Sequence, residues 1–379
     1  MKCKLSDICD FRKGKVDVSN LTLKTYISTE NMLPNKGGIT VASSLPTVQL
    51  TQEYKKGDVL VSNIRPYFKK IWRAKYDGGC SNDVLVFQGN SNIDGNFLYY
   101  VLANDDFFAY SMATSKGTKM PRGDKTSIMQ YEVPKFDIDT QRKIASVLRN
   151  LDEIIELNSA INNNLEQQAQ AIFSNEFLTL ETLPDGWKQA SLIGIADYLN
   201  GLAMQKYRTN ADETGIPVLK IKELRQGCCD DNSELCSSNI KSEYIIHDGD
   251  VIFSWSGSLL VDFWCGGICG LNQHLFKVTS SKYDKWFYYA WTKHHLDRFI
   301  AVAADKATTM GHIKRDELSK AEVLIPNEAD YKRIGALLQP IYDLIIANRI
   351  ENKKLAETRD MLLPKLMSGE IAISEVDYE

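Results

Sequence analysis

The second half of this 379-residue chain repeats the plan of its first half about 190 residues later. The stretch 141–148 (Gln-Arg-Lys-Ile-Ala-Ser-Val-Leu) aligns with 331–338 (Tyr-Lys-Arg-Ile-Gly-Ala-Leu-Leu). Upstream, further segments recur in the same order: Lys56-Gly57-Asp58-Val59 as Asp248-Gly249-Asp250-Val251, Phe97–Tyr100 as Trp286–Tyr289, and Val133-Pro134 as Ile325-Pro326. Each repeat therefore consists of a globular segment followed by a long amphipathic helix. Such a duplication suggests one molecule that grips two separated sites.

The length and composition favour two globular domains without a membrane segment. A chain of 379 residues can bury two cores, and 44% hydrophobic with 25% charged residues is ordinary for a globular protein. No apolar run reaches membrane-spanning length, and the N-terminus lacks the pattern of a signal peptide. We therefore expect a cytoplasmic protein with no membrane partner. The eight cysteines lack paired C-x-x-C spacing, which favours buried thiols over a zinc site.

Basic residues are concentrated locally, although the net charge is −4. Residues 55–75 contain seven Lys and Arg residues and only Asp58 as an acid, and residues 116–125 contain four against Asp124. In the second repeat the basic residues Lys206, Arg208, Lys220, Lys222 and Arg225 are diluted by Asp212, Glu213 and Glu223. A local patch can supply the phosphate contacts that dominate affinity for DNA, despite an acidic whole. A solvated charged face is the alternative interpretation.

The two long helices follow a seven-residue hydrophobic pattern, which is typical of helices that lie along one another. No Pro or Gly interrupts residues 141–177. The expected seam comprises Ile144, Leu151, Asn158, Leu165 and Ile172, with Val147, Ile154 and Ile161 alongside. The second copy has Ile334, Ile341, Asn348, Leu355 and Leu362, with Leu337 and Leu344 alongside. Each helix extends roughly 54 Å at 1.5 Å per residue, which suits a spacer.

Asn158 and Asn348 occupy the same interior position of the two helices. A lone polar residue at such a site weakens the seam but fixes its register. We hypothesise that the helices pack antiparallel and that these two asparagines pair; an exposed asparagine on a rotated face is the alternative. Pro340 has no counterpart in the first helix, so the second helix is expected to kink there or to end near Leu338 and restart at Pro340.

Each globule is expected to mix strands and helices around equivalent loops. Strands are predicted at 58–62, 84–87, 250–254 and 274–278, and helices at 97–103 and 286–293, with Tyr99-Tyr100 and Tyr288-Tyr289 packing the helices onto the sheets. Polar loops follow the Gly-Asp strands and precede the Val133-Pro134 and Ile325-Pro326 strands. Basic and hydroxyl side chains there can contact phosphates and guanine edges. The candidate DNA-binding residues of the first repeat are Arg65, Lys69, Lys70, Arg73, Lys116, Thr118, Lys119 and Arg122; those of the second are Lys206, Arg208, Lys222, Ser256, Ser258, Lys306, Thr309, His312 and Lys314.

No catalytic constellation is present in the sequence. The Asn/Asp-Pro-Pro-aromatic tetrapeptide of amino-group DNA methyltransferases is absent, because no two prolines are adjacent. There is no G-x-G-x-x-G or Walker loop, and the five histidines do not fall at a metal-binding spacing. No catalytic residue, metal or cofactor is therefore predicted in this chain, although the numerous acidic residues leave a nuclease site formally open.

The arrangement resembles the specificity subunit of a type I restriction–modification enzyme over essentially the whole chain. The resemblance is carried by Gly57-Asp58-Val59 and Gly249-Asp250-Val251, by Val133-Pro134 and Ile325-Pro326, by the helix start at Gln141–Ala145, and by the terminal run Leu362–Ile371. It implies an α+β fold with two target-recognition domains (1–139 and 179–329), a central helical spacer (140–178) and a C-terminal helical spacer with tail (330–379). Pro340 departs from the pattern, and the first repeat lacks the Leu183–Trp187 segment that opens the second, so its first strand is expected to be short.

The resemblance also implies a function. Such subunits are not enzymes; each recognition domain reads one half of a split double-stranded DNA target, and the antiparallel helices set the spacer between the halves. Two modification subunits, which bind S-adenosylmethionine and methylate adenine, are expected to dock on the helices, and restriction subunits complete the complex. The alternatives are a self-contained DNA-modifying enzyme and a structural coiled-coil scaffold.

Overall fold

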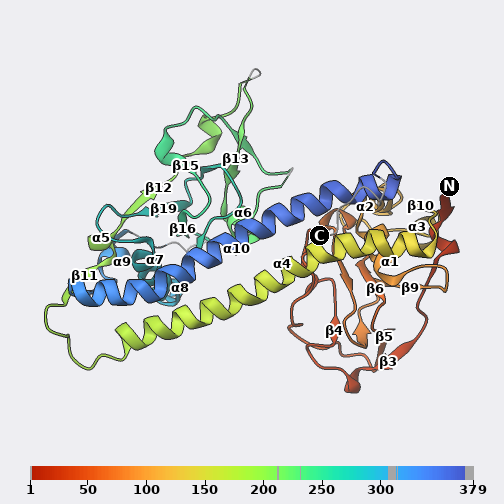
Figure 1. Ribbon diagram of the computed structural model, residues 1–379, viewed down its shortest axis with the longest axis horizontal. Helices are drawn as coiled ribbons and strands as arrows, with labels where there is room; N and C mark the ends of the chain where they lie inside the picture. Colours follow the sequence, from red (N-terminus) through yellow and green to blue (C-terminus); the bar gives the residue numbers. More distant parts are fainter. Residues whose placement is uncertain (1, 211–212, 231, 306–312, 314, 372–379) are drawn as a thin grey trace. The chain divides into compact units, whose positions relative to one another are not determined.

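Two long helices, α4 (Ile138–Phe173) and α10 (Glu328–Ser368), each contribute residues to two units of the fold. In the computed structural model, residues 2–210, 213–230, 232–305, 313 and 315–371 are described. Unit 1 combines residues 1–153 with 355–379, and unit 2 comprises residues 154–354. Each unit contains a globule of sheets and short helices packed on its portions of α4 and α10 (Figure 1). The predicted α+β architecture is confirmed.

The globule of unit 1 is built on two four-stranded sheets and one strand pair. One sheet has the order β2 (Cys9–Phe11), β9 (Val84–Gly89), β6 (Val59–Ser62), β7 (Ile71–Arg73), and the other has the order β3 (Lys15–Asp17), β5 (Leu50–Tyr54), β8 (Gly78–Cys80), β4 (Tyr26–Ile27). The strand pair joins the short first strand β1 (Lys2–Lys4) to β10 (Glu132–Pro134). The helices of this globule are α1 (Gly95–Ala103), α2 (Asp105–Ala113) and α3 (Lys125–Ile128).

The globule of unit 2 has the same kinds of parts. One sheet has the order β12 (Asp197–Asn200), β19 (Leu275–Thr279), β16 (Val251–Ser254), β17 (Leu260–Phe263), and the other has the order β14 (Leu235–Cys236), β13 (Ile216–Leu219), β18 (Cys269–Leu271), β15 (Ile245–Ile246). The strand pair is β11 (Lys188–Ser191) with β20 (Glu322–Ile325). The helices are α5 (Leu192–Ile195), α6 (Ile221–Gln226), α7 (Lys285–His294), α8 (Leu296–Asp305) and α9 (Arg315–Ser319).

The strand pairings of the two globules match except at one edge. The order β2-β9-β6-β7 corresponds to β12-β19-β16-β17, with every neighbouring pair antiparallel. In the second sheet β4 pairs in parallel with β8 as β13 does with β18, while β5 and β15 occupy the other side of the central strand. Unit 1 then adds β3 beside β5, whereas unit 2 adds β14 beside β13. The sequence repeat is therefore a structural repeat with different edges.

The repeated Gly-Asp turns start the central strands β6 and β16 in the same way. Gly57 and Gly249 have φ values of 96° and 83°, a conformation that side chains with a Cβ rarely adopt. The Asp58 carboxylate accepts a hydrogen bond from the Lys55 backbone N–H (2.8 Å), and the Asp250 carboxylate accepts one from the His247 N–H (2.9 Å). Each turn aims the chain into a strand whose four residues are all buried. This motif therefore serves folding rather than recognition.

Helices α1 and α7 pack against the sheets through aromatic side chains, as predicted. Tyr100, Tyr288 and Tyr289 are buried, and the Tyr289 ring stacks on Phe263 of β17 with centroids 3.8 Å apart. The cores of both units extend into the long helices. Ile144, Leu148, Leu363 and Leu366 join the core of unit 1, and Phe173, Ile334, Leu338 and Tyr342 join that of unit 2. Each globule is consequently fixed to its helical portions by a continuous apolar core.

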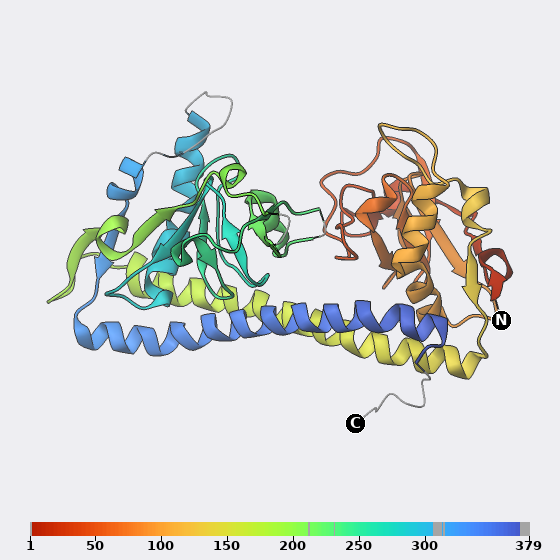
Figure 2. The same ribbon diagram turned by 90° about the horizontal axis from the view of Figure 1, so that it is seen from above.

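Within each unit, α4 and α10 run antiparallel side by side (Figures 1 and 2). In unit 2, Glu176 pairs with Arg333 (2.7 Å) and Glu166 with Arg349 (2.8 Å); in unit 1, Asp152 pairs with Arg359 (2.6 Å). The predicted row Ile144, Leu151, Asn158, Leu165, Ile172 is buried or half-buried. The second predicted row of α4, Val147, Ile154 and Ile161, was misplaced by one residue. Ile154 and Ile161 are exposed, whereas Leu148, Asn162 and Ala169 are buried. Leu337 and Leu344 are likewise exposed, and Leu338 and Ile345 are buried.

The predicted pairing of the two seam asparagines was wrong, and so was the predicted break of the second helix near Pro340; the alternative, a kink at Pro340, stays a prediction. Asn158 and Asn348 do not pair with each other. Asn158 Nδ2 donates to Asn352 Oδ1 (3.0 Å) and Glu351 Oε2 (2.8 Å), and Asn348 Nδ2 donates to Asn162 Oδ1 (2.9 Å). Asn162 and Asn352 are themselves equivalent in the repeat, so the seam holds two related asparagine pairs. Pro340 does not divide the second helix, because α10 continues from Glu328 to Ser368.

Candidate nucleic-acid interface

Three loops of unit 1 are joined to one another by hydrogen bonds. We call residues 28–46 the first loop, 63–70 the second loop and 115–124 the third loop. The second and third loops are linked by Gly123 N–H to Asn63 O (3.2 Å) and by Arg65 N–H to Pro121 O (2.8 Å). The first and second are linked by Asn35 N–H to Phe68 O (2.8 Å) and by Lys36 N–H to Lys69 O (2.9 Å). The sequence-distant loops therefore form one surface.

The first and second loops of unit 1 contain strained backbone. Asn35, Lys36, Arg65 and Lys69 have φ values of 54°, 61°, 51° and 50°, which is the left-handed region that non-glycine residues rarely adopt. Such residues cost free energy, and they cluster where function requires an over-determined shape. The Lys36 side chain is buried between Asp105 (3.1 Å) and Asp360 (3.3 Å), which anchors the first loop to α2 and α10. Lys36 was not predicted as a site residue.

The predicted basic residues of unit 1 divide into exposed and internally paired groups. Thr118 and Lys119 are exposed at the tip of the third loop. Lys116 pairs with Asp124 (2.6 Å), and this hydrogen bond, with that from Ser127, lowers the pKa of Asp124 to about 2. Arg122 pairs with Asp83 (3.1 Å), and Lys69 pairs with Asp105 (2.8 Å). These pairs hold cations at the loop surface.

Three predicted residues are partly withdrawn from solvent. Lys70 Nζ donates to the Thr29 carbonyl of the first loop (2.6 Å), and burial lowers the pKa of Lys70. Arg65 is half-buried with its Nε lacking a hydrogen-bond partner among the described residues. Arg73 lies in β7 beside Gly95 of α1, where burial lowers its pKa, and its Nε also lacks a partner in the described part of the chain. The position of Arg73 favours a packing role.

In unit 2 one main-chain hydrogen bond between the loop segments is equivalent to one in unit 1, and a side-chain hydrogen bond provides a second contact. The first loop of unit 2, residues 220–230, includes the short helix α6, and its second loop comprises residues 255–259. Of residues 306–314, which correspond to the third loop, only Ile313 is described. Ile313 N–H donates to Trp255 O (3.1 Å), as Gly123 N–H does to Asn63 O in unit 1. The buried Ser254 hydroxyl donates to Ser256 O (3.3 Å), as the Ser62 hydroxyl does to Ile64 O (3.1 Å). The first and second loops meet where Arg225 Nη1 donates to Ser258 Oγ (3.2 Å).

The predicted residues of unit 2 have diverse surroundings. Ser256 is buried and hydrogen-bonded to His274 Nδ1 (3.1 Å), whereas Ser258 is exposed. Lys222 pairs with Asp230 (3.1 Å) but keeps more than half of its side chain exposed. Lys206 and Arg208 are exposed on the separate connection between β12 and β13. The remaining predicted residues, Lys306, Thr309, His312 and Lys314, lie outside the described residues.

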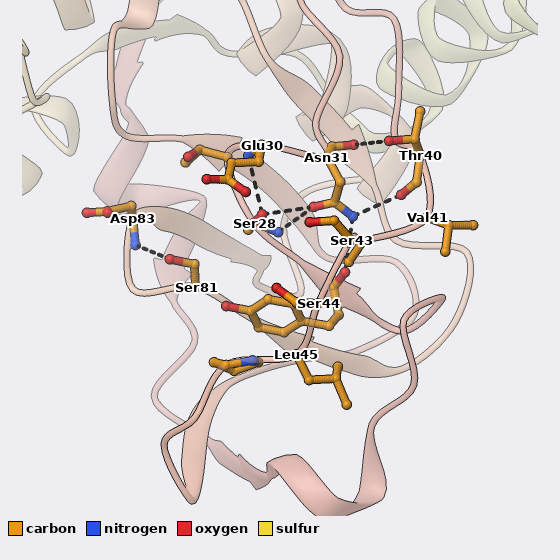
Figure 3. Close-up of a pocket in the computed structure, with 14 residues that line it drawn as sticks. Ser28, Glu30, Asn31, Thr40, Val41, Ser43, Ser44, Leu45, Ser81 and Asp83 are labelled. Carbon is orange, nitrogen blue, oxygen red and sulfur yellow. Dashed lines mark hydrogen bonds between the residues drawn. The ribbon is translucent and has the colours of Figure 1, made fainter. Parts of the chain in front are cut away.

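An open pocket in unit 1 is formed by the first loop together with Tyr26, Ser81 and Asp83 (Figure 3). It is lined mainly by residues of the first loop, five of which carry hydroxyl groups. Asn31 forms its floor: Asn31 Oδ1 accepts from Ser28 N–H (2.6 Å), and its Nδ2 donates to the carbonyls of Tyr26 (3.1 Å) and Thr40 (2.9 Å). Sequence reasoning missed this pocket because its residues carry no basic cluster and no similarity between the repeats.

Among the described residues, no group of three His, Cys, Asp or Glu side chains is placed to hold a metal ion. In the same part of the chain, no helix is long and apolar enough to cross a membrane.

Comparison with known proteins identifies the family. The model of the type I restriction modification DNA specificity domain matches residues 1–167 and again residues 184–357. The MjaIX specificity subunit of Methanocaldococcus jannaschii, a type I restriction enzyme subunit, is 25% identical and covers 95% of this chain and 88% of the relative. The HindI specificity subunit of Haemophilus influenzae is 22% identical over 97% of this chain and 98% of the relative. The crystal structure of a type I restriction–modification S subunit from M. genitalium shares the fold, with a TM-score of 0.56, 15% identity and coverage of 97% of this chain and 96% of that chain. This chain therefore belongs to the type I restriction modification DNA specificity family and carries two copies of the family's domain.

Proposed function

We propose that this chain is the non-catalytic, target-reading subunit of a type I restriction–modification assembly, and that each unit reads one half of a split double-stranded DNA sequence. One observation carries the proposal: in both units a main-chain hydrogen bond at the same place joins the segment after the Gly-Asp strand to the segment before the last strand (Gly123 N–H to Asn63 O, and Ile313 N–H to Trp255 O), while the side chains around it differ. A shared frame with different side chains is expected of two domains that read different sequences, because base edges are distinguished by side-chain contacts. Binding to cellular DNA implies a cytoplasmic location.

The exposed apolar residues of the long helices support docking of two partner subunits. On α4, Ile154, Leu157 and Ile161 are 40%, 62% and 44% exposed, and their spacing of three and four residues places them on one helix face. On α10, Leu344 is 46% exposed and is the repeat equivalent of Ile154. Contiguous exposed apolar side chains mark interaction surfaces. We assign these residues to two modification subunits, which carry S-adenosylmethionine, with restriction subunits joining the assembly.

Methylome sequencing tests the proposed function. Cells that express this chain with its modification subunit should show methylation at a split motif, and deletion of this chain alone should remove the motif. The purified chain with S-adenosylmethionine and DNA should transfer no methyl group until the modification subunit is added. Methyl transfer by the chain alone would favour a self-contained DNA-modifying enzyme, and loss of the chain without any change in methylation would favour a structural scaffold.

A phosphate contact by Lys119 provides a second test. Lys119→Ala should weaken DNA binding by the assembly and reduce the dependence of log affinity on log salt by about one counterion, because each neutralised phosphate releases about one ion. Lys15→Ala is the matched control, since Lys15 is an exposed lysine of β3 at the opposite sheet edge from the first loop. An unchanged salt dependence for Lys119→Ala would remove this residue from the interface.

A further inference from the structure

Glu30 of unit 1 and Lys222 of unit 2 occupy equivalent positions with opposite charges. The equivalence follows from the parallel strand pairs, in which Ile27 of β4 lies opposite Cys80 of β8 and Leu219 of β13 lies opposite Leu271 of β18. Glu30 and Lys222 each stand three residues beyond these strand positions. The repeat alone did not align them, because the surrounding residues differ.

The turn that follows each strand confirms the alignment. In unit 1 the Ser28 N–H donates to the Asn31 side-chain oxygen (2.6 Å), and in unit 2 the Lys220 N–H donates to a Glu223 carboxylate oxygen (3.3 Å). The strand opposite continues the match, since Ser81 N–H donates to Ile27 O (2.8 Å) as Asn272 N–H donates to Leu219 O (3.2 Å). Both charged residues thus sit one position before the side chain that closes the same turn.

Both positions face the other loops of their unit. The residue before Glu30, Thr29, accepts a hydrogen bond from Lys70 of the second loop, and Glu30 lies at the exposed rim of the pocket beside Asp83, which pairs with Arg122 of the third loop (Figure 3). In unit 2, the residue before Lys222, Ile221, lies against Gly257 of the second loop. Glu30 is exposed, and Lys222 is more than half exposed although it pairs with Asp230 (3.1 Å) and with the buried Glu223 (3.7 Å).

A carboxylate within a basic DNA-binding surface indicates which group of the DNA it contacts. Phosphates repel it, so it contributes to binding only where it meets a hydrogen-bond donor on a base edge. In the major groove the exocyclic amino groups of cytosine and adenine are such donors, and the commonest acidic contact is to cytosine N4. A lysine at the same place meets the O6 and N7 acceptors of guanine. Exchanging one charge for the other therefore exchanges the base that is accepted.

We propose that Glu30 and Lys222 are specificity-determining residues of opposite charge. Glu30 selects a base with an exocyclic amino group, cytosine above all, in the half-target read by unit 1. Lys222 selects guanine in the half-target read by unit 2. This inference rests on the proposed function and adds to it the position in each unit that reads a base. Asp230, which pairs with Lys222 in the free chain, holds the ammonium at the surface until guanine replaces it.

Methylome sequencing of cells that carry the complete assembly tests the pair of residues. Glu30→Lys should change the base preference at a single position of one half-motif toward guanine on the contacted strand, with methylation of the original sequence reduced on the order of tenfold or more. Lys222→Glu should change a single position in the other half-motif in the reverse sense. Glu132→Lys, which reverses an exposed charge on β10, is the matched control and should leave the motif unchanged.

The outcomes separate this inference from the proposed function. Absence of any motif dependent on the wild-type chain would contradict the proposed function itself. A wild-type motif that persists unchanged in both variants, or that weakens evenly at every position, would overturn the assignment of Glu30 and Lys222. Folding is controlled within each experiment, because the half-motif read by the unaltered unit must remain intact; a variant that loses all methylation is repeated as Glu30→Gln or Lys222→Gln, which must relax the same single position.

Discussion

The globules of units 1 and 2 share a main-chain frame but stabilise it with different side chains. The turns before β6 and β16 have the same hydrogen bonds, yet Asp58 forms an ion pair with Arg12 near the end of β2, whereas Asp250 pairs with Lys277 of β19 (2.8 Å). The anchors to the helices also differ. Tyr100 donates to Asp152 (2.6 Å) in unit 1, while Arg349 bridges Asp262 (2.7 Å) and Glu166 (2.8 Å) in unit 2. Backbone geometry was therefore retained while its supporting side chains were replaced.

The largest expected difference between the units concerns these turns. Asp58→Ala should destabilise unit 1 by about 3 kcal/mol, because it removes the partner of the mostly buried Arg12 and the acceptor of the Lys55 N–H. Asp250→Ala should cost unit 2 about 1.5 kcal/mol, since Lys277 keeps its hydrogen bond to Ile245 O (3.1 Å). Hydrogen exchange of β6 and β16 measures each unit separately. Equal losses would show that the turn, not the ion pair, sets the stability.

Acid should destabilise unit 2 selectively. Burial lowers the pKa of His295 to about 4 from an unfolded value near 6.5, even though its Nε2–H donates to Glu322 O (2.8 Å). The unfolded chain binds the proton more readily between these values, so the free energy of unfolding falls as pH drops from about 6.5 toward 4, by about 2 kcal/mol at pH 5. All five histidines lie between residues 247 and 312, so unit 1 lacks this contribution. Hydrogen exchange at pH 7 and 5 checks it. His295→Gln should reduce the difference to the part left by the neighbouring His294, whose pKa burial also lowers.

The two asparagine pairs of the helix seam should respond unequally. Asn348→Leu leaves the buried Asn162 Oδ1 without its donor and should cost about 1.5 kcal/mol. Asn158→Leu should cost less, because its partner Glu351 is exposed and water can replace the lost hydrogen bond. The double substitution of Asn162 and Asn348 by Leu should restore stability. Chemical unfolding of the three variants and the wild-type chain measures these differences, and equal costs for the single variants would contradict the assignment.

The smallest expected effect concerns Arg73, whose equivalent in the strand register is Phe263. Arg73→Leu should change the free energy of unfolding by less than about 1 kcal/mol or stabilise unit 1, because the guanidinium is partly buried and its Nε has no hydrogen-bond partner among the described residues. DNA affinity and its salt dependence should not change. A weakened, less salt-dependent complex would instead return Arg73 to the DNA interface.

Structural features that both repeats share could be predicted from the sequence. Features that depend on contacts between residues distant in the chain could not. The Gly-Asp turns, the aromatic helices and the seam through Ile144 and Asn158 followed from local pattern. The second seam row was misplaced by one residue, because burial against the globules, as at Leu148, rather than heptad spacing decides that face. The asparagine pairing was wrong because repeat equivalence does not mean contact: in an antiparallel pair, Asn158 faces Asn352.

The candidate interface was predicted only in outline. The second and third loops follow recognisable strands, so their equivalence was visible in the sequence. Glu30 was missed because the first loop has no similarity to residues 220–230, and only the parallel register of β4 and β13 aligns the two. Lys36 and Asp83 were missed because their partners, Asp360 and Arg122, are distant in the chain.

In each globule a hydrogen bond between main-chain amide and carbonyl groups, which almost every amino acid carries, joins the second loop to the segment before the last strand. Substitution of an outward-facing side chain leaves this main-chain attachment in place. A few point substitutions can therefore change what the surface binds while every variant along the way keeps its fold. Proteins built this way can diversify rapidly under selection, and Thr118, exposed at the tip of the third loop of unit 1, is a position where side chains can be exchanged without removing a loop attachment.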